Sequence, residues 1–499
     1  MSERPPRVNI EREIKLQVPA GFRLPDLGGD GLEAVERPVE RLITTYVDTS
    51  DLRIARWRSS LRHRRGEGWT VKLPAPDEGS LLARREHVFE GSDPRKLPVA
   101  AADLVRAFVR KAELAPVARL QTRRAGVEVK DELGRTVAHV TDDEVSVMDG
   151  RRVASRFREV EVELDASASE RVADSLVARL QKAGAGPVDN VSKLRRALGS
   201  RAEDAADVAV EELDADATVI DVVRRALASS AVRLLTHDPG VRLGDDPEDV
   251  HQARVATRRL RSDLRSFRDV IDLAWATPLR DELRWLGSAL GAVRDAEVLR
   301  ERLRSWSSGL PHAEELEADA LIAGLDARRD EARDALLASM REPRYVELLD
   351  GLVDAAHDPR VLDEIASSPA REALAPVLDA PWKHLESAID RIASDPSNEA
   401  LHAARIRAKR VRYAAEAVAP VFGKIARKFA GAAEELQDIL GEHQDAVVAV
   451  AWLREARTGR YAFVAGQLVA FETTAARTAR DAWPAAWKAL SRKRLRFWT

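Results

Sequence analysis

The 499-residue sequence contains no cysteine. Disulfide bonds, thiol nucleophiles and cysteine-ligated metals are therefore excluded. Long apolar runs are also missing: no stretch approaches the length of a membrane span, and residues 1–9 carry no apolar signal segment. We therefore expect a soluble, cytoplasmic protein that has no membrane partner.

Aromatic residues are scarce, at 5% of the chain, and the charge is nearly balanced. Asp, Glu, Lys and Arg make up 33% of the residues, yet the net charge is only −3. General nucleic-acid binders usually have an overall basic domain, so this balance argues against nucleic acid as the partner. Apolar residues make up 45%, and the length is sufficient for two or three domains with full-sized cores.

The character of the chain changes near residue 200. Before it, short alternating segments separated by turn residues predict an antiparallel β-sheet, with helices at 103–112 and 169–182. The expected strands are 10–18, 42–47, 60–65, 69–73, 126–129, 136–140, 145–148 and 157–164. The stretch 202–217 is acidic and rich in alanine, which indicates a linker or a weak leading helix.

After residue 217 the apolar positions follow a helical period. The expected helices are 218–236, 247–272, 278–306, 314–340 and 398–417. Their composition of Ala, Leu, Arg and Glu is typical of packed bundles. The fold class predicted for the whole chain is therefore α+β with two domains, a β-structure followed by an all-α domain.

The first strand carries an unusual row of charges. Glu11, Glu13 and Lys15 occupy alternate positions, so they lie on one face of a β-strand. A strand facing a core normally places apolar residues on such a face. Two acids and a base in this row indicate a polar interior that holds a metal ion and an anion.

Other strands supply matching groups. Glu159, Glu161 and Glu163 share one face of a later strand, and Arg62 and Arg64 share one face of another. Carboxylates from two strands suit Mg²⁺, and several cations are needed to bind a polyanion. A closed antiparallel barrel would enclose both sets, because inward and outward positions alternate. The alternative is an open sheet whose charges face solvent.

The opening strand resembles the Glu-x-Glu-x-Lys signature of the CYTH family, the triphosphate tunnel metalloenzymes. Further segments match the family in order over roughly residues 7–200. These segments are 46–49, 61–64, 71–74, 84–86, 122–124, 159–164 and 192–193.

The CYTH resemblance implies a tunnel that binds triphosphate with Mg²⁺ or Mn²⁺. The implied catalytic residues are Glu11, Glu13 and Lys15, and the implied metal ligands are Glu11, Glu13, Asp142, Glu159, Glu161 and Glu163. The implied phosphate-binding residues are Lys15, Arg62, Arg64, Lys72, Arg84, Arg123 and Lys193. Period-2 parity admits only one member of each adjacent pair, so Arg84/Arg85, Arg123/Arg124 and Asp142/Asp143 stay open, with the first member of each preferred.

The helical half contains an internal repeat. The segment 251–261 matches 402–412, and 290–296 matches 440–446. The offsets from His251 to Asp295 and from His402 to Asp445 are 44 and 43 residues. Two elements in the same order at nearly the same spacing predict two similar four-helix bundles related by duplication.

Each copy of the repeat carries a basic row on one helix face. In the first copy the row is His251, Arg254, Arg258, Arg261 and Arg265, and in the second it is His402, Arg405, Lys409 and Arg412. The spacing of three and four residues keeps each row on one side of its helix. Two such rows would suit a linear polyanion, because arginine forms bidentate bonds with phosphate. The alternative is a solvated face that pairs with acids of neighbouring helices.

The repeat motif resembles the CHAD domain, the conserved-histidine α-helical domain often found behind CYTH. This resemblance implies binding of inorganic polyphosphate by residues 217–499. Nucleic acid uses the same phosphate chemistry, but no base-stacking aromatic residues alternate with these arginines.

The sequence therefore predicts a tunnel domain at 7–200, an acidic linker at 201–216 and a helical polyphosphate-binding domain at 217–499. The expected activity is metal-dependent hydrolysis of tripolyphosphate or polyphosphate. Two alternatives stay open: an adenylate cyclase with the same tunnel fold, and a non-catalytic protein that binds polyphosphate and localises to polyphosphate granules. Metal preference, chain length and oligomeric state are not determined by the sequence.

Overall fold

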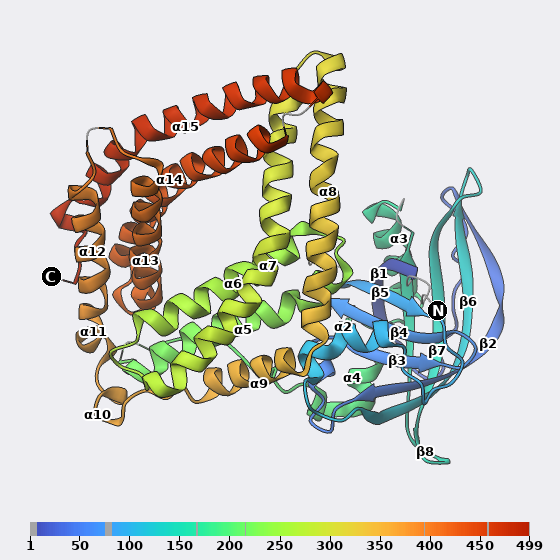
Figure 1. Cartoon of the computed structure of the whole chain (residues 1–499). Coiled ribbons are helices and arrows are strands. Elements are labelled where there is room, and N and C mark those ends of the chain that lie inside the picture. Colours follow the sequence, from blue (N-terminus) through green and yellow to red (C-terminus); the bar gives the residue numbers. More distant parts are fainter. Residues whose placement is uncertain are drawn as a thin grey trace. The chain divides into compact units, whose positions relative to one another are not determined.

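The computed structural model describes residues 7–74, 82–165, 168–214, 216–393, 395–456 and 459–498. The chain divides into two compact units, Met1–Asp207 and Val208–Thr499. The first unit contains the strands and the second contains the long helices (Figure 1). The division between the units falls inside residues 201–216.

The first unit is a closed antiparallel barrel in the order β1-β5-β4-β3-β2-β6-β7-β8. Its strands are β1 (Arg7–Gln17), β2 (Leu32–Asp48), β3 (Ser60–Arg64), β4 (Gly68–Pro74), β5 (Leu82–Phe89), β6 (Ala115–Asp131), β7 (Thr136–Asp149) and β8 (Arg152–Leu164). Closure makes each strand two-sided, with one set of alternate residues in the lumen and the other set outside.

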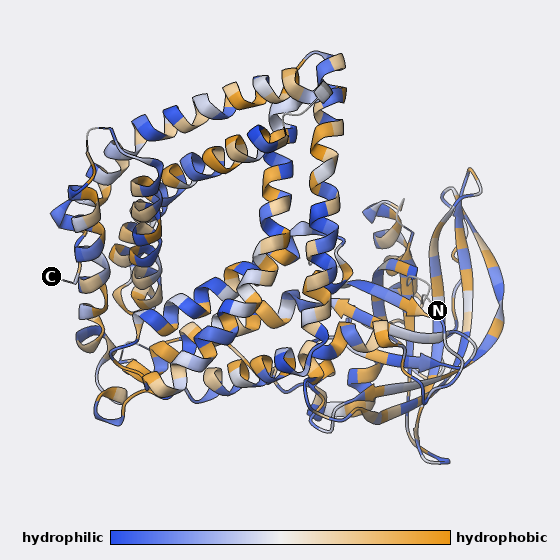
Figure 2. Cartoon of the chain, viewed as in Figure 1, coloured by the Kyte–Doolittle hydropathy of each residue, from blue (hydrophilic) through white to orange (hydrophobic). Residues whose placement is uncertain are grey.

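The outward face of the barrel is apolar where α3 (Glu170–Lys182) covers it. Leu16 of β1 and Val160 of β8 are fully buried there, together with Leu176 of α3. The inward positions of the same strands are charged. This arrangement reverses that of a barrel with an apolar interior, and Figure 2 shows the alternation of hydrophilic and hydrophobic residues along the strands.

The lumen becomes apolar near α4 (Lys193–Leu198). Leu120 of β6 and Val145 of β7 pack there with Leu194 of α4. The polar part of the lumen is therefore bounded by an apolar cluster, and α4 carries Lys193 into the charged region at its first helical position.

Several strands are longer than the sequence predicts. The segments 136–140 and 145–148 are one strand, β7, because its intervening polar residues are tolerated where one side of the strand faces a polar lumen. The alternation of the sequence did not delimit β5 (LARREHVF), because three adjacent charged residues interrupt it; only the CYTH-like segment 84–86 pointed to a strand there. The predicted helix at 103–112 is α2 (Val99–Val109).

The second unit consists of long helices with short connecting ones. These are α5 (Val219–Leu243), α6 (Pro247–Ser266), α7 (Leu273–Ser307), α8 (His312–Arg341), α9 (Pro343–His357), α10 (Asp363–Ala366), α11 (Ala370–Ala373), α12 (Asp379–Asp390), α13 (Asn398–Phe422), α14 (Lys424–Ala456) and α15 (Ala462–Leu490). Helix α7 begins before Pro278, where the sequence predicted its start, because the Asp272 side chain caps it by accepting a hydrogen bond from Ala274 N at 2.8 Å.

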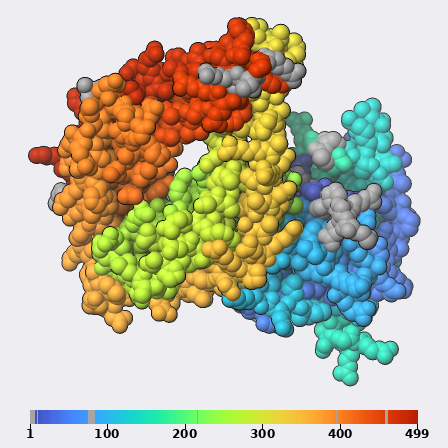
Figure 3. All heavy atoms as spheres, in the orientation of Figure 1, coloured from blue at the N-terminus to red at the C-terminus, as the bar shows by residue number. Residues whose placement is uncertain are grey.

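The duplication is visible as α5–α8 and α12–α15. Within this unit the helices form the sides of a frame, and an open space remains inside it in the space-filling view (Figures 1 and 3). The copies meet at two junctions. Helix α6 packs on α13 at one of them. At the other, Leu303 of α7 shares an apolar cluster with Leu453 of α14 and Leu468 of α15.

The helices α14 and α15 were not among those that the periodicity of the sequence predicted. None of the described helices combines the length and the apolar character needed to cross a bilayer.

Asp48, in one of the CYTH-like segments, has a structural role. Its buried carboxylate accepts hydrogen bonds from the backbone N–H groups of Thr49, Ile54 and Ala55 at 2.7, 2.9 and 2.9 Å. It thereby holds α1 (Arg53–Arg56) at the end of β2.

We expect Asp48→Ala to lower the free energy of unfolding of the first unit by about 2–4 kcal/mol, since buried N–H groups would lose a charged acceptor. Differential scanning calorimetry of the whole chain would measure the change. Asp149→Ala, at the exposed turn between β7 and β8, is the control and should change stability by no more than about 0.5 kcal/mol. Equal effects of the two substitutions would contradict the assigned role.

Candidate functional site

The pairing of β1 with its neighbours places acids opposite bases across the lumen. Glu11 lies opposite Arg84 of β5, and Lys15 lies opposite Glu161 of β8. The Lys15 ammonium donates to Glu13 at 2.9 Å and also to Glu161. Although burial acts to lower it, Glu161 and Glu13 raise the pKa of Lys15 to about 12. Lys15 is therefore a permanent cation in the tunnel wall.

A second group of charges joins β1, β3, β4 and β5. Lys72 donates to Glu11 at 2.7 Å, and Arg62 donates to Glu86 at 2.6 Å. Burial acts to raise the pKa of Glu11, but the Lys72 ammonium outweighs it and holds that pKa below the usual value. Glu86 was not among the predicted site residues, although it directly follows the predicted arginine pair.

Lys193 is the centre of a third group. Its ammonium lies 2.9 Å from Asp143, 2.8 Å from Glu159 and 2.7 Å from Glu161. Arg124 joins this group, at 2.6 Å from Asp143 and 3.1 Å from Glu161. The pKa of Lys193 is raised well above its usual value, because these carboxylates outweigh the effect of burial.

Three arginines lie near one another on one wall of the tunnel, and each also pairs with a carboxylate: Arg62 with Glu86, Arg64 with Glu67 and Arg124 with Asp143. Arg64 lies near both Arg62 and Arg124, and burial together with these two cations lowers the pKa of its guanidinium. The cavity has a volume of about 280 Å³ and is lined by groups from all three sets, including Lys15, Arg84 and Glu163. Because like charges face one another here, a bound anion would relieve their repulsion.

Glu163 differs from the other lumen acids. It lies directly opposite Glu13, and none of the described residues offers it a hydrogen bond or an ion pair. Solvent reaches its side chain from the lumen. Burial by the surrounding protein and the nearby carboxylates of Glu11 and Glu13 raise the pKa of Glu163 to about 6.

A divalent cation fits the chemistry of this acid group. Carboxylate oxygens are the ligands that Mg²⁺ and Mn²⁺ prefer, and the mutual repulsion of Glu11, Glu13 and Glu163 is what a cation would neutralise. As they stand, however, no three acidic or histidine side chains in the described part of the chain converge closely enough to hold a metal. Lys72 and Lys15 currently engage Glu11 and Glu13, so these carboxylates must exchange partners to bind one.

Two predicted tunnel residues lie outside the lumen. Asp142 pairs with Arg158 at 2.6 Å on the outward face, and Arg123 is exposed and pairs with Glu144. Their neighbours Asp143 and Arg124 face inward instead. The error is one of parity, because adjacent residues of a strand point to opposite sides and sequence alone did not set the register.

Arg196 of α4 was also missed. It lies 3.1 Å from Glu159, which is fully buried and also bonded to Lys193. Glu159 therefore lies between two cations at one end of the acid row and does not itself line the cavity. Arg84 does line the cavity.

The basic rows of the helical unit lie where the two copies of the repeat meet. In each copy an arginine packs over a glycine and pairs with an aspartate. Arg254 lies over Gly291 and 2.9 Å from Asp295, while Arg405 lies over Gly441 and 3.7 Å from Asp445. The recurring Gly and Asp positions of the repeat motif thus hold these two guanidinium groups at equivalent places.

Lys409 shows that the two rows face each other. It lies on α13, yet besides burial and Arg405 the cations acting on it are Arg258 and Arg254 of α6. Together they lower the pKa of Lys409 to about 7. Cations held this close together repel one another, and a bound anion would relieve that repulsion.

Three residues of the rows have distinct surroundings, and one of them, Arg412, is not available to a ligand as predicted. Arg412 is not free: it pairs with Glu416 and Glu434, both at 2.7 Å. Burial and the nearby Arg294 lower the pKa of His251, which disfavours the charged form of its imidazole. His402 is half-buried, and its Nδ1 atom has no hydrogen-bond partner among the described residues.

Comparison with known proteins agrees with both halves of the architecture. Residues 9–198 match the family model of the CYTH domain, and residues 225–454 match that of the CHAD domain. Uncharacterized proteins of Mycobacterium tuberculosis strains CDC 1551 / Oshkosh and H37Rv are each 32% identical over 477 residues, which cover 89% of this chain and 88% of theirs.

Two solved structures resemble parts of the chain. PptA from Streptomyces chartreusis is 24% identical, with a TM-score of 0.46 over 55% of this chain and 100% of its own. The CHAD domain from the plant Ricinus communis is 27% identical, with a TM-score of 0.45 over 57% of this chain and 96% of its own.

The Lys193 group yields a stability prediction. Lys193→Met would leave Asp143, Glu159 and Glu161 as buried like charges, so we expect a loss of about 3–5 kcal/mol at pH 7. Lys193 and its neighbouring cations hold the pKa of Glu161 well below its usual value, so the stabilisation is present above the usual range of a glutamate and is lost as the pH falls. The deficit of the variant should therefore shrink towards pH 4.

Thermal unfolding between pH 4 and pH 8 would measure this deficit. Arg123→Met, which removes an exposed ion pair, is the control and should cost at most about 1 kcal/mol at any pH. A Lys193→Met deficit that is independent of pH would contradict the electrostatic explanation.

Proposed function

The chain belongs to the family of proteins that join an N-terminal CYTH domain to a C-terminal CHAD domain, and from that membership we propose that it hydrolyses inorganic triphosphate or polyphosphate in its tunnel. CYTH domains are found in triphosphatases and cyclases, which typically use a divalent metal. The observation that carries the proposal is the tunnel itself, in which the acids Glu11, Glu13 and Glu163 share one cavity with several arginine and lysine side chains.

The cationic wall would bind the phosphates. Arg62, Arg64 and Arg124 present guanidinium groups, which form bidentate bonds with phosphate oxygens. Lys72 and Arg84 lie farther along the same cavity, and Lys15 and Lys193 lie beside the acids. The carboxylates that now neutralise these cations would exchange places with phosphate oxygens when the substrate binds.

Glu11, Glu13 and Glu163 are the residues best placed to hold Mg²⁺ or Mn²⁺, with Glu161 next to them. The bound ion would orient and activate a water molecule for in-line attack on the terminal phosphorus. The arginines would stabilise the charge on the transferring phosphoryl group.

We propose that the helical unit binds inorganic polyphosphate at the junction of its two copies. The groups that would contact it are His251, Arg254, Arg258, Arg261, Arg265, His402, Arg405 and Lys409. One support is that the two rows, on α6 and α13, face each other. Another is that, among the described residues, no carboxylate lies within ion-pair distance of Arg258 or Lys409. The helical unit would thereby supply the polymer to the enzyme or the enzyme to the polymer.

Substitutions of two adjacent arginines, one facing the lumen and one facing outward, test whether the tunnel is the catalytic site. Arg124→Gln should lower kcat/KM for tripolyphosphate by about 100-fold or more, since a preorganised cation facing the substrate is lost. Arg123→Gln should leave activity near that of the wild type, because Arg123 points outward and pairs with Glu144. Orthophosphate release with Mg²⁺ or Mn²⁺ is the measurement.

The same assay separates the alternatives. Pyrophosphate release from ATP would identify a cyclase. A wild type that binds polyphosphate but releases neither product would identify a non-catalytic binding protein. Equal losses in Arg124→Gln and Arg123→Gln would contradict the inward position of Arg124.

The helical site predicts a pH-dependent affinity. Bound phosphate would raise the pKa of Lys409 from about 7, so at higher pH binding must take up a proton. Affinity for polyphosphate should be highest below pH 7 and should fall above it, by at most about tenfold per pH unit for one proton. Lys409→Met should remove this slope, whereas Lys428→Met, on the exposed surface of α14, should preserve it.

Titration calorimetry between pH 6 and pH 9, in two buffers that differ in ionisation enthalpy, would measure both the affinity and the proton uptake. If the affinity of Lys409→Met changed with pH as steeply as that of the wild type, the proton would be taken up by another group.

A further inference from the structure

The two copies of the repeat are not equivalent at the ends of their basic rows. When the two motifs are aligned, Arg258 corresponds to Lys409 and Arg261 corresponds to Arg412. One turn further on, Arg265 of the first copy corresponds to Glu416 of the second. The next position of the row is therefore a basic residue in the first copy and an acidic residue in the second.

The partner helices differ in the same way. Gly291 and Asp295 of α7 correspond to Gly441 and Asp445 of α14, so Arg284 corresponds to Glu434. By the same offset, Arg280 corresponds to Ala430. Two arginines of the first copy are thus replaced by an acid and a small neutral residue in the second.

In the first copy these arginines belong to one continuous surface. Helices α6 and α7 are consecutive and pack against each other. Arg254 lies over Gly291, and the Arg261 guanidinium lies 4.0 Å from the position that a Cβ atom on Gly287 would occupy. Spacings of four, three and four residues place Arg280, Arg284, Gly287 and Gly291 on one face of α7. The α6 row and this α7 face therefore lie side by side.

The arginines at the far end of this surface lack carboxylate partners. Among the described residues, no acid lies within ion-pair distance of Arg261, Arg265 or Arg280, and Arg284 has only Asp281 of its own helix. Burial and the nearby Arg410, Arg280, Arg261 and Arg284 lower the pKa of Arg265 to about 10. Five guanidinium groups, one of them that of Arg410 on α13, thus crowd together with little to neutralise them.

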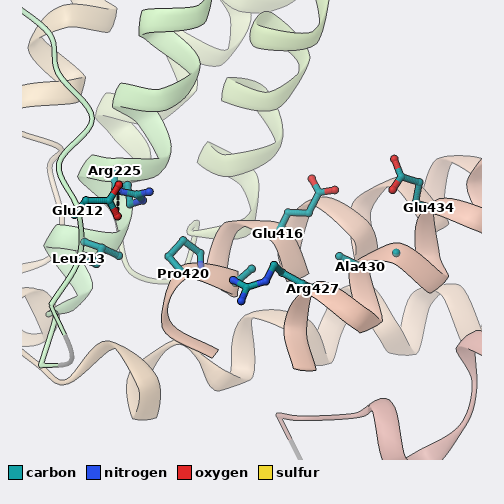
Figure 4. A pocket seen from close by; sticks show the side chains of 10 residues that line it. Glu212, Leu213, Arg225, Glu416, Pro420, Arg427, Ala430 and Glu434 are labelled. Atoms are coloured by element: carbon teal, nitrogen blue, oxygen red, sulfur yellow. Dashed lines mark ion pairs between the residues drawn. The ribbon is translucent and has the colours of Figure 1, made fainter. Parts of the chain in front are cut away.

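In the second copy the same region is closed by acids. Glu416 pairs with Arg412 of its own helix and with Arg259 of α6, while Glu434 also pairs with Arg412. Figure 4 shows the carboxylates of Glu416 and Glu434 pointing to the same side of α13 and α14, beside a pocket of about 500 Å³ that also contains Arg427. The only basic residue of the row at this end is therefore already occupied by protein carboxylates.

We propose that polyphosphate follows an asymmetric path, from the junction of the two copies outward over α6 and α7, and that Glu416 and Glu434 exclude it from the corresponding surface of α13 and α14. The residues that extend the site are Arg261, Arg265, Arg280 and Arg284. This inference rests on the proposed polyphosphate binding and adds to it a direction and a preference for length. From Arg254 to Arg265 the path runs over about 16 Å of helix, which a chain of many phosphates can span and triphosphate cannot.

The surface favours inorganic polyphosphate over nucleic acid. Nucleic-acid grooves combine cations with aromatic side chains on which bases stack. The α6 row and the facing positions of α7 consist of arginine, histidine and glycine, without an aromatic residue. A polymer that offers charge alone matches this composition.

The test compares two matched double variants in the full-length protein. Arg280→Ala/Arg284→Ala removes the extension, while Lys424→Ala/Lys428→Ala removes the same charge at the same spacing from α14, the equivalent helix of the other copy. We expect the first variant to bind long-chain polyphosphate at least about tenfold more weakly. Its salt dependence, as the slope of log K against log[salt], should also fall by about 1–2. The second variant should bind within about twofold of the wild type.

Short ligands and a third variant sharpen the test. Binding of tripolyphosphate should be unchanged in Arg280→Ala/Arg284→Ala, because the extension lies beyond a short ligand at the junction. Glu434→Ala should bind long chains about as well as or more tightly than the wild type, since it frees Arg412 in part. Weaker binding by Glu434→Ala would overturn the exclusion by the acids. Circular dichroism melting would verify that each variant is folded.

The remaining outcomes also decide the matter. Equal losses of affinity in the two double variants would show that only the net charge matters, and this would overturn the proposed path. Unchanged affinity in Arg280→Ala/Arg284→Ala, with normal binding by the wild type, would overturn the path alone. No binding by the wild type would overturn the proposed polyphosphate binding as well. Equally tight binding of a single-stranded RNA through the same arginines would overturn the assignment to polyphosphate.

Discussion

Charge balance inside a closed barrel is the constraint on which the tunnel depends. The barrel directs acids and bases into one lumen, where none can be left isolated without a large cost in desolvation. The single ammonium group of Lys193, for example, lies within 2.9 Å of three carboxylates from β7 and β8. The ligand-free tunnel is thus neutralised internally, and the same cations become available to phosphate when the carboxylates take up a metal or another partner.

The two units meet the same requirement in different ways. The tunnel holds both signs of charge, and among its described acids Glu163 is left without an ion-pair partner. The helical unit instead brings cations of its two copies together at the junction of α6 and α13, where burial and neighbouring arginines lower the pKa of Lys409. In both places repulsion between like charges is stored in the fold, and a ligand of opposite charge releases it.

Duplication explains both what the helical copies share and where they differ. The arginine–glycine–aspartate arrangement recurs in each copy: Arg254 lies over Gly291 and pairs with Asp295, just as Arg405 lies over Gly441 and pairs with Asp445. Beyond that arrangement, Glu416 occupies the position of Arg265. The two copies therefore share the groups at the junction and differ in the charges at the ends of their rows.

The sequence by itself determined which residue types gather: the alternation of Glu11, Glu13 and Lys15 and the three-and-four spacing of Arg254, Arg258 and Arg261 are local patterns that fix a face of a strand or helix. Which of two neighbours faces the lumen was decided only by strand register, because a shift of one residue exchanges the faces, and so Asp143 and Arg124 lie inside rather than Asp142 and Arg123. The pairing of Arg412 with Glu416 and Glu434, and the meeting of the two basic rows, likewise depend on how separate helices pack. Local periodicity thus specified the chemistry of the site, and tertiary structure decided which charges remain available to a ligand.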